Sequence, residues 1–450
     1  MDSSTGDTSG LFERLAASLA GEKHPESEGD TAAILAQLEY SPDRDADIVL
    51  RRQRITLLKA ASRFSRVFRL GSPDAPGMFF FGAEVSPGIV DPMHRQHPRI
   101  SASGAGPSLR QAFEGCIGEG VEYLSQFEIA DDKPRRMALP DGLASLDTQS
   151  GHMVSRLLRG SAGPVPDQID WIEATQLSSG QRVLFPADLA LRRAPERSAL
   201  VPPFRLSCGC AAGPSFATAA VHGMLELIER DALSQWWRGG ARGRLVALED
   251  DSLPAVSGLV EQMRKGAERR RTWLLDITTD LDVPTVVAIS SLPDGRGVAC
   301  GFSARTTLRA AAQSALVEMS QMELAYAVVE AKRSEGSPLS EYDELHLIRR
   351  SAIDAARCEL LHPVAPPRRH REIEAATPEQ ALASLVERLS ASGIETYAID
   401  LIRPAFEVPV VRIIAPCLQL EPCDVITERL MAVRTRTGGG EAYTRGISLL

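Results

Sequence analysis

The chain has 450 residues, with 50 basic and 59 acidic side chains and a formal net charge of −9. This balance disfavours a general nucleic-acid coat, because surplus negative charge repels phosphates. Hydrophobic residues make up 44% of the chain, which is too much for a mainly disordered protein. The polar start of the chain has no signal peptide, and no apolar run reaches the roughly 18 residues of a membrane span. We therefore expect a cytoplasmic protein.

The first 75 residues differ in pattern from the rest of the chain. Three leucines at i+4 spacing, beginning at Leu11, share one face of a short helix. Residues 21–30 have the composition of a solvated linker, and an arginine-rich helix is expected over residues 46–66. The sequence therefore predicts a short helical N-terminal arm or linker, residues 1–75, in front of one large domain, residues 76–450.

From residue 71 onward, glycine and proline separate short apolar runs from longer amphipathic segments. The expected helices span residues 108–127, 215–237, 255–271, 307–332 and 378–392. The expected strands span residues 78–81, 273–277, 283–290, 397–401 and 408–414. This alternation predicts a mixed α/β (α+β) fold, without the 20–50-residue period of a solenoid.

One pattern occurs three times, at the starts of three expected helices. Its template is Ser or Thr, an apolar residue, two residues, Ala, six residues, Glu, two residues, and Glu or Gln. The copies begin at Ser108, Ser215 and Thr307. A hydroxyl residue before an apolar-periodic run is a helix N-cap signal, and Ala two turns before the first Glu permits close packing. The pattern therefore predicts an internal pseudo-repeat.

Each copy ends in two acidic or amide side chains: Glu119 and Glu122, Glu226 and Glu229, and Glu318 and Gln321. The first two pairs are embedded in apolar sequence, so we expect them to face a cleft; the alternative is a solvated acidic face. Adjacent like charges destabilise a helix, and Mg²⁺, which takes oxygen ligands, would offset that repulsion. The predicted metal ligands are Glu119, Glu122, Glu226 and Glu229.

Mg²⁺ commonly holds substrate phosphates, which also need cations or N–H donors nearby. The candidates are Arg230, Arg305, Arg309, the flexible backbone that begins at Ser103, and the neutral groups of His222 and Gln321. The chain has no Gly-Lys dipeptide and hence no P-loop, and it lacks the zinc-protease and nucleophile-elbow motifs. If the chain uses ATP, it holds ATP on acidic helices.

Cys208 and Cys210 stand at the start of the second copy, separated by one glycine. No second Cys or His pair with zinc spacing follows, so buried small hydrophobes are favoured over a metal site. The segment from Cys208 through residues 226–232 to Trp236 and Trp237 resembles the signature of YcaO-domain proteins. Three further stretches fit the same family: residues 103–122, 171–186 and 301–321.

The resemblance covers roughly residues 76–440 and implies one large YcaO-type domain. Its Cys-Gly-Cys start and the Ser-Gly-Ala-Gly sequence from Ser103 look most like the cyclodehydratase (D-type) subunit of microcin-type thiazole/oxazole-modified peptide synthetases. It implies an enzyme that uses ATP and Mg²⁺ to phosphorylate backbone amides of a ribosomally made precursor peptide. A Cys, Ser or Thr side chain attacks the preceding carbonyl, and loss of phosphate leaves a thiazoline or oxazoline.

The resemblance also implies roles for matched residues. The expected catalytic residues are Glu229, Arg230 and Gln321. The expected ATP contacts include the phosphate-binding candidates above. They are Ser103, Glu119, His222, Glu226, Arg230, Arg305, Arg309, Glu318 and Gln321. The implied partners are the precursor peptide, a peptide-recognition subunit (E1-like, with an RRE domain) and, for full azoles, an FMN-dependent dehydrogenase, in a hetero-oligomer that can have a homodimeric core.

Several positions depart from the family pattern. Ala105, Tyr123 and Ser314 stand where many members have basic residues, and no proline follows Pro422, although azoline-forming members often end in a proline-rich tail. Two alternatives therefore stay open. One is thioamide or macroamidine formation by the same ATP activation, and the other is a catalytically degenerate scaffold subunit.

Overall fold

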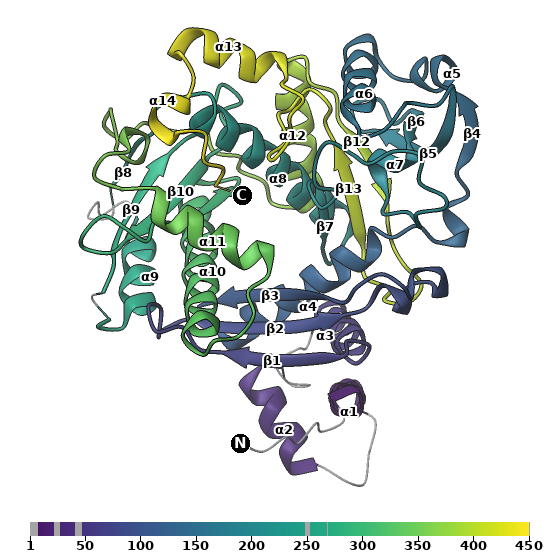
Figure 1. Ribbon diagram of the computed structural model, residues 1–450. Coiled ribbons are helices and arrows are strands. Elements are labelled where there is room, and N and C mark those ends of the chain that lie inside the picture. The colour runs from purple at the N-terminus through teal and green to yellow at the C-terminus, as the bar shows by residue number, and fades with distance from the viewer. Residues whose placement is uncertain (1–7, 22–27, 41–46, 248–252, 268, 450) are drawn as a thin grey trace.

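The computed structural model describes residues 8–21, 28–40, 47–247, 253–267 and 269–449. Three antiparallel β-sheets carry the fold, and a long helix packs on each of them (Figure 1). The expected mixed α/β class is confirmed. Within the described residues, no helix has both the length and the apolar character needed to cross a membrane.

The three-stranded sheet lies next to the N-terminal helices. It contains β1 (Arg66–Leu70), β2 (Phe79–Val85) and β3 (Ile100–Gly106), and α4 (Leu109–Ser125) packs on it. The N-terminal helices are α1 (Thr8–Ala20), α2 (Glu28–Gln37) and α3 (Ile48–Ala61). Leu15 and Leu19 of α1 are fully buried, and the Phe12 ring stacks on Phe113 of α4 at 5.6 Å. The N-terminal helices thus share one hydrophobic cluster with the first sheet.

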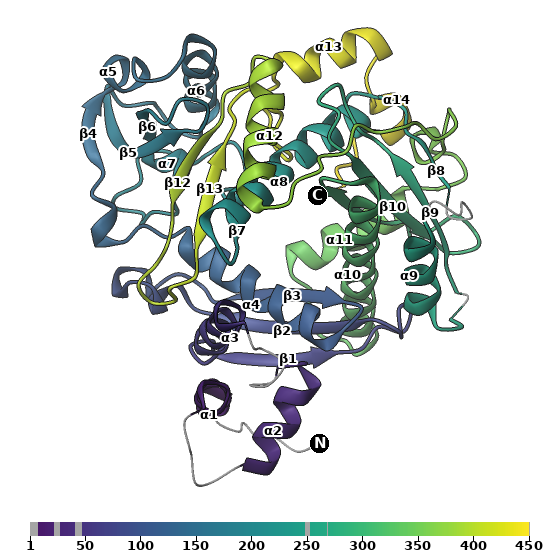
Figure 2. The ribbon, with the colours of Figure 1, turned by 180° about the vertical axis from the view of Figure 1, so that it is seen from behind.

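The six-stranded sheet has the order β4-β5-β12-β13-β7, with β6 paired to β5. Its strands are β4 (Arg135–Ala138), β5 (Gln168–Gln176), β6 (Arg182–Pro186), β7 (Cys210–Ala212), β12 (Tyr397–Asp400) and β13 (Val410–Ile414). The helices nearby are α5 (Leu139–Leu143), α6 (Thr148–Gly160), α7 (Ala187–Ala190), α8 (Phe216–Trp237) and α12 (Pro378–Ala391). α8 packs against both β13 and α12 (Figure 2) and is therefore buried on nearly all sides, as its mostly apolar sequence requires.

The four-stranded sheet has the order β11-β10-β9-β8. Its strands are β8 (Arg244–Val246), β9 (Arg271–Asp276), β10 (Thr285–Ser291) and β11 (Ala299–Ala304). The remaining helices are α9 (Pro254–Arg264), α10 (Leu308–Ser334), α11 (Glu341–Ala352), α13 (Glu428–Thr437) and α14 (Glu441–Thr444). Short 3₁₀ helices span Pro87–Ile89, Pro92–His94, Ala130–Asp132 and Glu359–Leu361. Because every residue of β10 and β11 is buried, their sequences are nearly continuous runs of apolar and small residues.

Two predicted helices are shorter than expected. The helix predicted over residues 46–66 ends at Ala61, because Arg66 begins β1 and pairs with Glu84 of β2. The helix predicted over residues 255–271 ends at Arg264, because Lys265 and the following glycine have φ angles of 41° and 81°. Left-handed residues end a helix, and the chain then turns into β9.

Candidate functional site

The three copies of the sequence pattern form three similar strand–helix units: β3 with α4, β7 with α8, and β11 with α10. In each unit the N-cap hydroxyl accepts a hydrogen bond from the backbone N–H three residues later. The pairs are Ser108 with Gln111 (3.3 Å), Ser215 with Thr218 (3.2 Å) and Thr307 with Ala310 (3.2 Å). The alanines of the pattern, Ala112, Ala219 and Ala311, are completely buried. The predicted caps and close packing are confirmed.

The first Glu of each unit reaches back to the chain just before its own helix. The backbone N–H of Ser103 donates to Glu119 (3.1 Å), that of Gly209 to Glu226 (3.0 Å) and that of Phe302 to Glu318 (2.6 Å). Each of these hydrogen bonds joins two residues that lie sixteen or seventeen positions apart in the sequence. The repeat thus sets one carboxylate of each helix at a fixed place beside the strand before it.

A cavity of about 830 Å³ lies where the three units meet. Most of the predicted site residues line it: Glu122, His222, Glu226, Glu229, Arg230, Arg305, Glu318 and Gln321. Three predicted residues do not line it: Ser103, Glu119 and Arg309. Glu119 and Arg309 are exposed, and the Glu119 carboxylate accepts hydrogen bonds from both the backbone and the hydroxyl of Ser103. All three predicted catalytic residues are thus brought together, whereas only part of the predicted ATP set is.

Carboxylates dominate the charge of this cavity. Four of them line it, against two guanidinium groups. Burial raises the pKa of Glu122 to about 8, and the nearby Glu226 and Glu119 add to the rise. Burial likewise raises the pKa of Glu229 to about 8 in spite of Arg230, and it raises the pKa of Glu318. These raised pKa values favour protonated carboxyl groups at neutral pH, and a divalent cation bound among them would stabilise their ionised forms.

Arg230 lies at the centre of these charges. Its Nη2 atom is 3.5 Å from Glu226 and 3.6 Å from Glu229. Burial opposes the charge of the guanidinium, but Glu229 and Glu226 outweigh burial and raise the pKa of Arg230. Its buried Nε and Nη1 atoms have no hydrogen-bond partner among the described residues. Unpaired buried donors are costly, so Arg230 is poised to bind an anion that enters the cavity.

The four predicted metal ligands are not gathered at one point. Glu122 accepts a hydrogen bond from the backbone N–H of Ala212 (2.7 Å), while Glu226 and Glu229 turn toward Arg230. The described residues contain no group of three or more His, Cys, Asp or Glu side chains close enough to hold a metal ion. The magnesium site on Glu119, Glu122, Glu226 and Glu229 therefore stays a prediction.

His222 and the cysteines behave as neutral groups. His222 lines the cavity, and its Nδ1 lies 3.4 Å from the Ala212 carbonyl oxygen. Partial desolvation of the ring by the cavity walls, together with Arg305, lowers the pKa of His222. All seven cysteines are free and buried, and burial raises the pKa of Cys208 to about 11 and that of Cys210 to about 12. These two thiols stay protonated at neutral pH, which agrees with their prediction as small hydrophobes.

One wall of the cavity consists of residues that the sequence analysis did not predict as part of the site. It comes from α9, through Ala255, Gly258, Leu259 and Gln262. Their spacing of i, i+3, i+4 and i+7 places them on one helical face, and this spacing was the available signal. The Gln262 amide donates to the Pro107 carbonyl at 2.9 Å, which ties α9 to the first unit.

The positions that depart from the expected pattern have two different environments. Ala105 and Ser314 line the cavity, and neither brings a charge. Tyr123 does not line it; its ring lies under the Arg192 guanidinium at 4.8 Å. The cationic groups that remain along the described lining are Arg230 and Arg305.

Comparison with known proteins identifies a matching protein family and individual relatives. The model of a protein family described as YcaO cyclodehydratase, ATP- and Mg²⁺-binding, matches residues 103–419. An uncharacterised protein of Methanothermobacter thermautotrophicus is 28% identical over 193 residues, 42% of this chain and 47% of that protein. An uncharacterised protein from the tfuA 3′ region of Rhizobium leguminosarum bv. trifolii is 30% identical over 270 residues, 56% of this chain and 61% of that protein. The matches thus span less than two thirds of either relative.

Solved structures share the fold at low sequence identity. A heterocyclase in complex with substrate and cofactor has a TM-score of 0.65 and 21% identity, over 85% of this chain and 54% of the other. YcaO from Methanopyrus kandleri, bound with AMPPCP and Mg²⁺, has a TM-score of 0.57 and 19% identity, over 82% and 90%. The E. coli microcin synthetase McbBCD complex has a TM-score of 0.57 and 15% identity, over 78% and 87%.

Proposed function

Since the chain belongs to the YcaO cyclodehydratase family, we propose that it uses ATP and Mg²⁺ to activate backbone amides of a ribosomally made precursor peptide. The products are thiazoline or oxazoline rings, ADP and phosphate. The observation that carries the proposal is Arg230, whose buried Nε and Nη1 atoms have no hydrogen-bond partner among the described residues, in a cavity lined by four carboxylates. A phosphate chain with a bound divalent cation supplies both the anion that Arg230 lacks and the positive charge that the carboxylates lack.

The chain's own residues divide the work of binding and positioning. ATP, when bound, supplies the phosphoryl group that turns an amide oxygen into a leaving group. Glu122, Glu226 and Glu229 would hold Mg²⁺, and Arg230 and Arg305 would neutralise charge on the phosphates. Such charge neutralisation and positioning account for most of the catalysis in phosphoryl transfer.

The third unit completes the reaction site. Glu318 is fixed by the backbone N–H of Phe302, and Gln321 lies one turn further along α10 on the same cavity wall. Gln321 offers both an amide donor and an acceptor, so it would orient the peptide amide toward the phosphates without adding charge. We assign Gln321 to positioning of the reacting amide, beside Glu229 and Arg230.

The proposed partners follow from the family and from the fold. We propose a separate peptide-recognition subunit for the precursor and an FMN-dependent dehydrogenase for full azoles. The McbBCD synthetase, whose fold this chain shares, is itself a complex and has been solved with pro-MccB17 bound. Residues 1–75 are proposed as a docking arm, and retained assembly after their removal would contradict that role.

Nucleotide binding gives the first test, because it needs no knowledge of the precursor. Titration calorimetry with AMPPCP and Mg²⁺ should show binding to the wild-type protein, and Arg230→Gln should weaken it at least tenfold. Arg333→Gln, an exposed change on α10, serves as the matched control and should bind like the wild type. Equal binding by Arg230→Gln and the control would contradict the proposed phosphate contact.

The missing basic positions favour a second function, a scaffold subunit. Only Arg230 and Arg305 supply positive charge along the described lining, because Ala105 and Ser314 are neutral. Absence of AMPPCP binding by the assembled complex would support this scaffold role. If nucleotide does bind, mass spectrometry of the modified peptide separates the chemistries. Loss of one water per site marks azoline formation, and replacement of oxygen by sulfur marks thioamide formation.

A further inference from the structure

A second cavity of about 670 Å³ lies at the C-terminal end of α8, beyond the cavity lined by Glu226, Glu229 and Arg230, which we call the nucleotide cavity. It is enclosed by the C-terminal part of α8, the edge strand β8, the segment after β9, and α13. Figure 1 shows α13, α14 and β8 at the same end of the molecule. None of its lining residues also lines the nucleotide cavity, so this hollow is a separate feature of the fold.

Positive charge is concentrated in this second cavity. Its arginines are Arg242, Arg244, Arg368, Arg429 and Arg436. Its acidic residues are Asp276, Asp280 and Glu428. Arg429, Arg242 and Arg368 also pair with Asp231, Glu359 and Asp282 outside the lining, so among the described residues the positive charge without an ion pair is that of Arg244 and Arg436. Unpaired guanidinium groups at a hollow attract anions.

The two aspartates of the cavity are already neutralised by near neighbours. Asp276 lies 3.0 Å from His370 and 3.4 Å from Arg368. Asp280 lies 2.6 Å from Arg429, which also pairs with the fully buried Asp231 at 3.0 Å. These contacts occupy Arg368 and Arg429, and they leave Arg244 and Arg436 without an ion pair among the described residues.

Arg244 and Arg436 provide the positive charge that remains. Both are exposed at the cavity, and neither has an ion pair among the described residues. Arg242 binds Glu359 through Nη1 at 3.0 Å, and its buried Nε atom has no hydrogen-bond partner there. Two hydroxyl side chains, Thr278 and Thr279, lie in the same lining. Guanidinium groups from β8 and α13 thus face one hollow from two sides.

We propose that this second cavity binds a phosphoryl group, held mainly by Arg244 and Arg436 with Arg242 beside them. A phosphoryl dianion offers three acceptor oxygens and two charges, which match guanidinium groups that approach from separate elements. A single carboxylate offers one charge and two oxygens, and it would neutralise only one of the two guanidinium groups of Arg244 and Arg436. The cavity is large enough for pyrophosphate or the phosphate end of a larger ligand.

Inorganic pyrophosphate in magnesium-free buffer is the probe for this site. Calorimetry should show that Arg244→Gln/Arg436→Gln weakens pyrophosphate binding at least tenfold. Arg271→Gln/Arg296→Gln removes the same charge from exposed positions outside both cavities and should leave the affinity unchanged. Arg244→Lys/Arg436→Lys keeps the charge without the guanidinium fork and should lose less affinity than the glutamine pair.

Two further measurements separate this site from other sources of binding. Arg230→Gln should retain pyrophosphate binding, because Arg230 lies in the other cavity. Loss of binding in Arg230→Gln, or unchanged binding in Arg244→Gln/Arg436→Gln, would overturn the proposal. Tighter binding of hexaglutamate than of pyrophosphate would also overturn it, because the site would then recognise carboxylates. Urea denaturation of each variant confirms that it is folded.

Discussion

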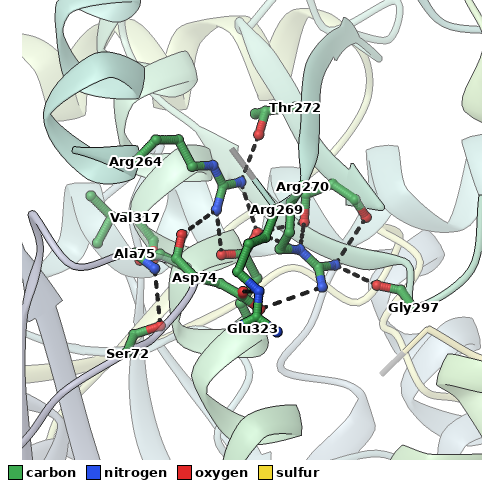
Figure 3. A network of polar contacts seen from close by, with 12 residues as sticks. Ser72, Asp74, Ala75, Arg264, Arg269, Arg270, Thr272, Gly297, Val317 and Glu323 are labelled. Carbon is green, nitrogen blue, oxygen red and sulfur yellow. Dashed lines mark hydrogen bonds and ion pairs between the residues drawn. The ribbon is translucent and has the colours of Figure 1, made fainter. Parts of the chain in front are cut away.

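Two clusters of buried charge lie a few residues apart on α10, and they are built in opposite ways. Glu323 is closed off: Arg264 donates to it at 2.8 and 2.9 Å, the Ser290 hydroxyl donates at 2.5 Å, and Arg270 lies at 3.1 Å (Figure 3). Glu318 instead faces a cavity in which carboxylates outnumber guanidinium groups and Arg230 keeps donors unpaired. Burial alone therefore does not mark a functional charge; incomplete pairing does.

We call Glu323 with Arg264, Arg270 and Ser290 the closed cluster, and the charged groups that line the nucleotide cavity the open cluster. The closed cluster fixes the helices that carry the open cluster. Arg264 is the last residue of α9, which forms one wall of the nucleotide cavity, and it also donates to the Asp74 carbonyl at 2.7 Å. Figure 3 shows the guanidinium groups of Arg264 and Arg270 turned toward Glu323. The closed cluster thus holds α9, α10 and the segment before β2 in place, while the cavity between them stays free for ligand.

The largest expected effect comes from breaking the closed cluster. Glu323→Ala leaves two buried guanidinium groups without their carboxylate, so we expect a loss of about 3–5 kcal/mol in the free energy of unfolding. Urea denaturation measures it. Glu330→Ala, on the same helix but in a partly exposed pair with Arg333, should cost less than about 1 kcal/mol. Equal costs would show that the network does not hold the fold.

The opposite result is expected in the open cluster. Glu229→Gln removes a charge that burial disfavours, so the free energy of unfolding at pH 8 should stay level or rise. Dehydration of the cognate precursor, followed by mass spectrometry, should fall by roughly 100-fold or more, because a phosphate-side charge is lost. If Glu229→Gln lowered the free energy of unfolding and kept its activity, the charge of Glu229 would serve stability rather than catalysis, and the contrast with Glu323 would be wrong.

Stability should also depend on pH through the open cluster. The pKa of Glu122 and that of Glu229 lie at about 8 in the folded protein, above the ordinary value of 4.5. Between these values the folded protein binds more protons than the unfolded chain, so its stability falls as pH rises from about 5 to 8.

The expected fall is several kcal/mol, because each group contributes up to about 1.4 kcal/mol per pH unit, and urea denaturation across that pH range in magnesium-free buffer measures it. Glu122→Gln/Glu229→Gln should flatten the profile, because its amides do not titrate. A profile that is equally steep in the double variant would assign the pH dependence to other groups.

The sequence predicted the repeated units well, because their signals are local. The hydroxyl caps, the buried alanines and the limits of α4, α8 and α10 all follow from residues within one helix. The arrangement of the units follows from contacts between distant segments. No local pattern shows that Gln262 bonds to Pro107, or that Arg264 and Glu323 meet, since 155 and 59 residues separate these partners.

The same limit explains the site residues that the structure leaves outside the cavity. Glu119 and Glu226 hold equivalent places in the repeat, yet Glu226 lines the cavity and Glu119 does not. Equivalent places in three units face the common centre from different directions. The helix pattern specifies which side chain stands beside its own strand, but the packing of the units decides whether that side chain reaches the shared cavity.

The smallest expected effect defines the edge of the open cluster. Arg305 and Arg309 flank the start of α10, but Arg305 lines the cavity and Arg309 is exposed outside it. Arg305→Gln should weaken binding of AMPPCP with Mg²⁺ roughly tenfold, whereas Arg309→Gln should change it less than about twofold, because solvent screens an exposed charge. Calorimetry at low and high salt measures both. An equal loss in the two variants would extend the phosphate-binding surface beyond the cavity, and it would make overall charge, rather than pairing within the cavity, the property that attracts the ligand.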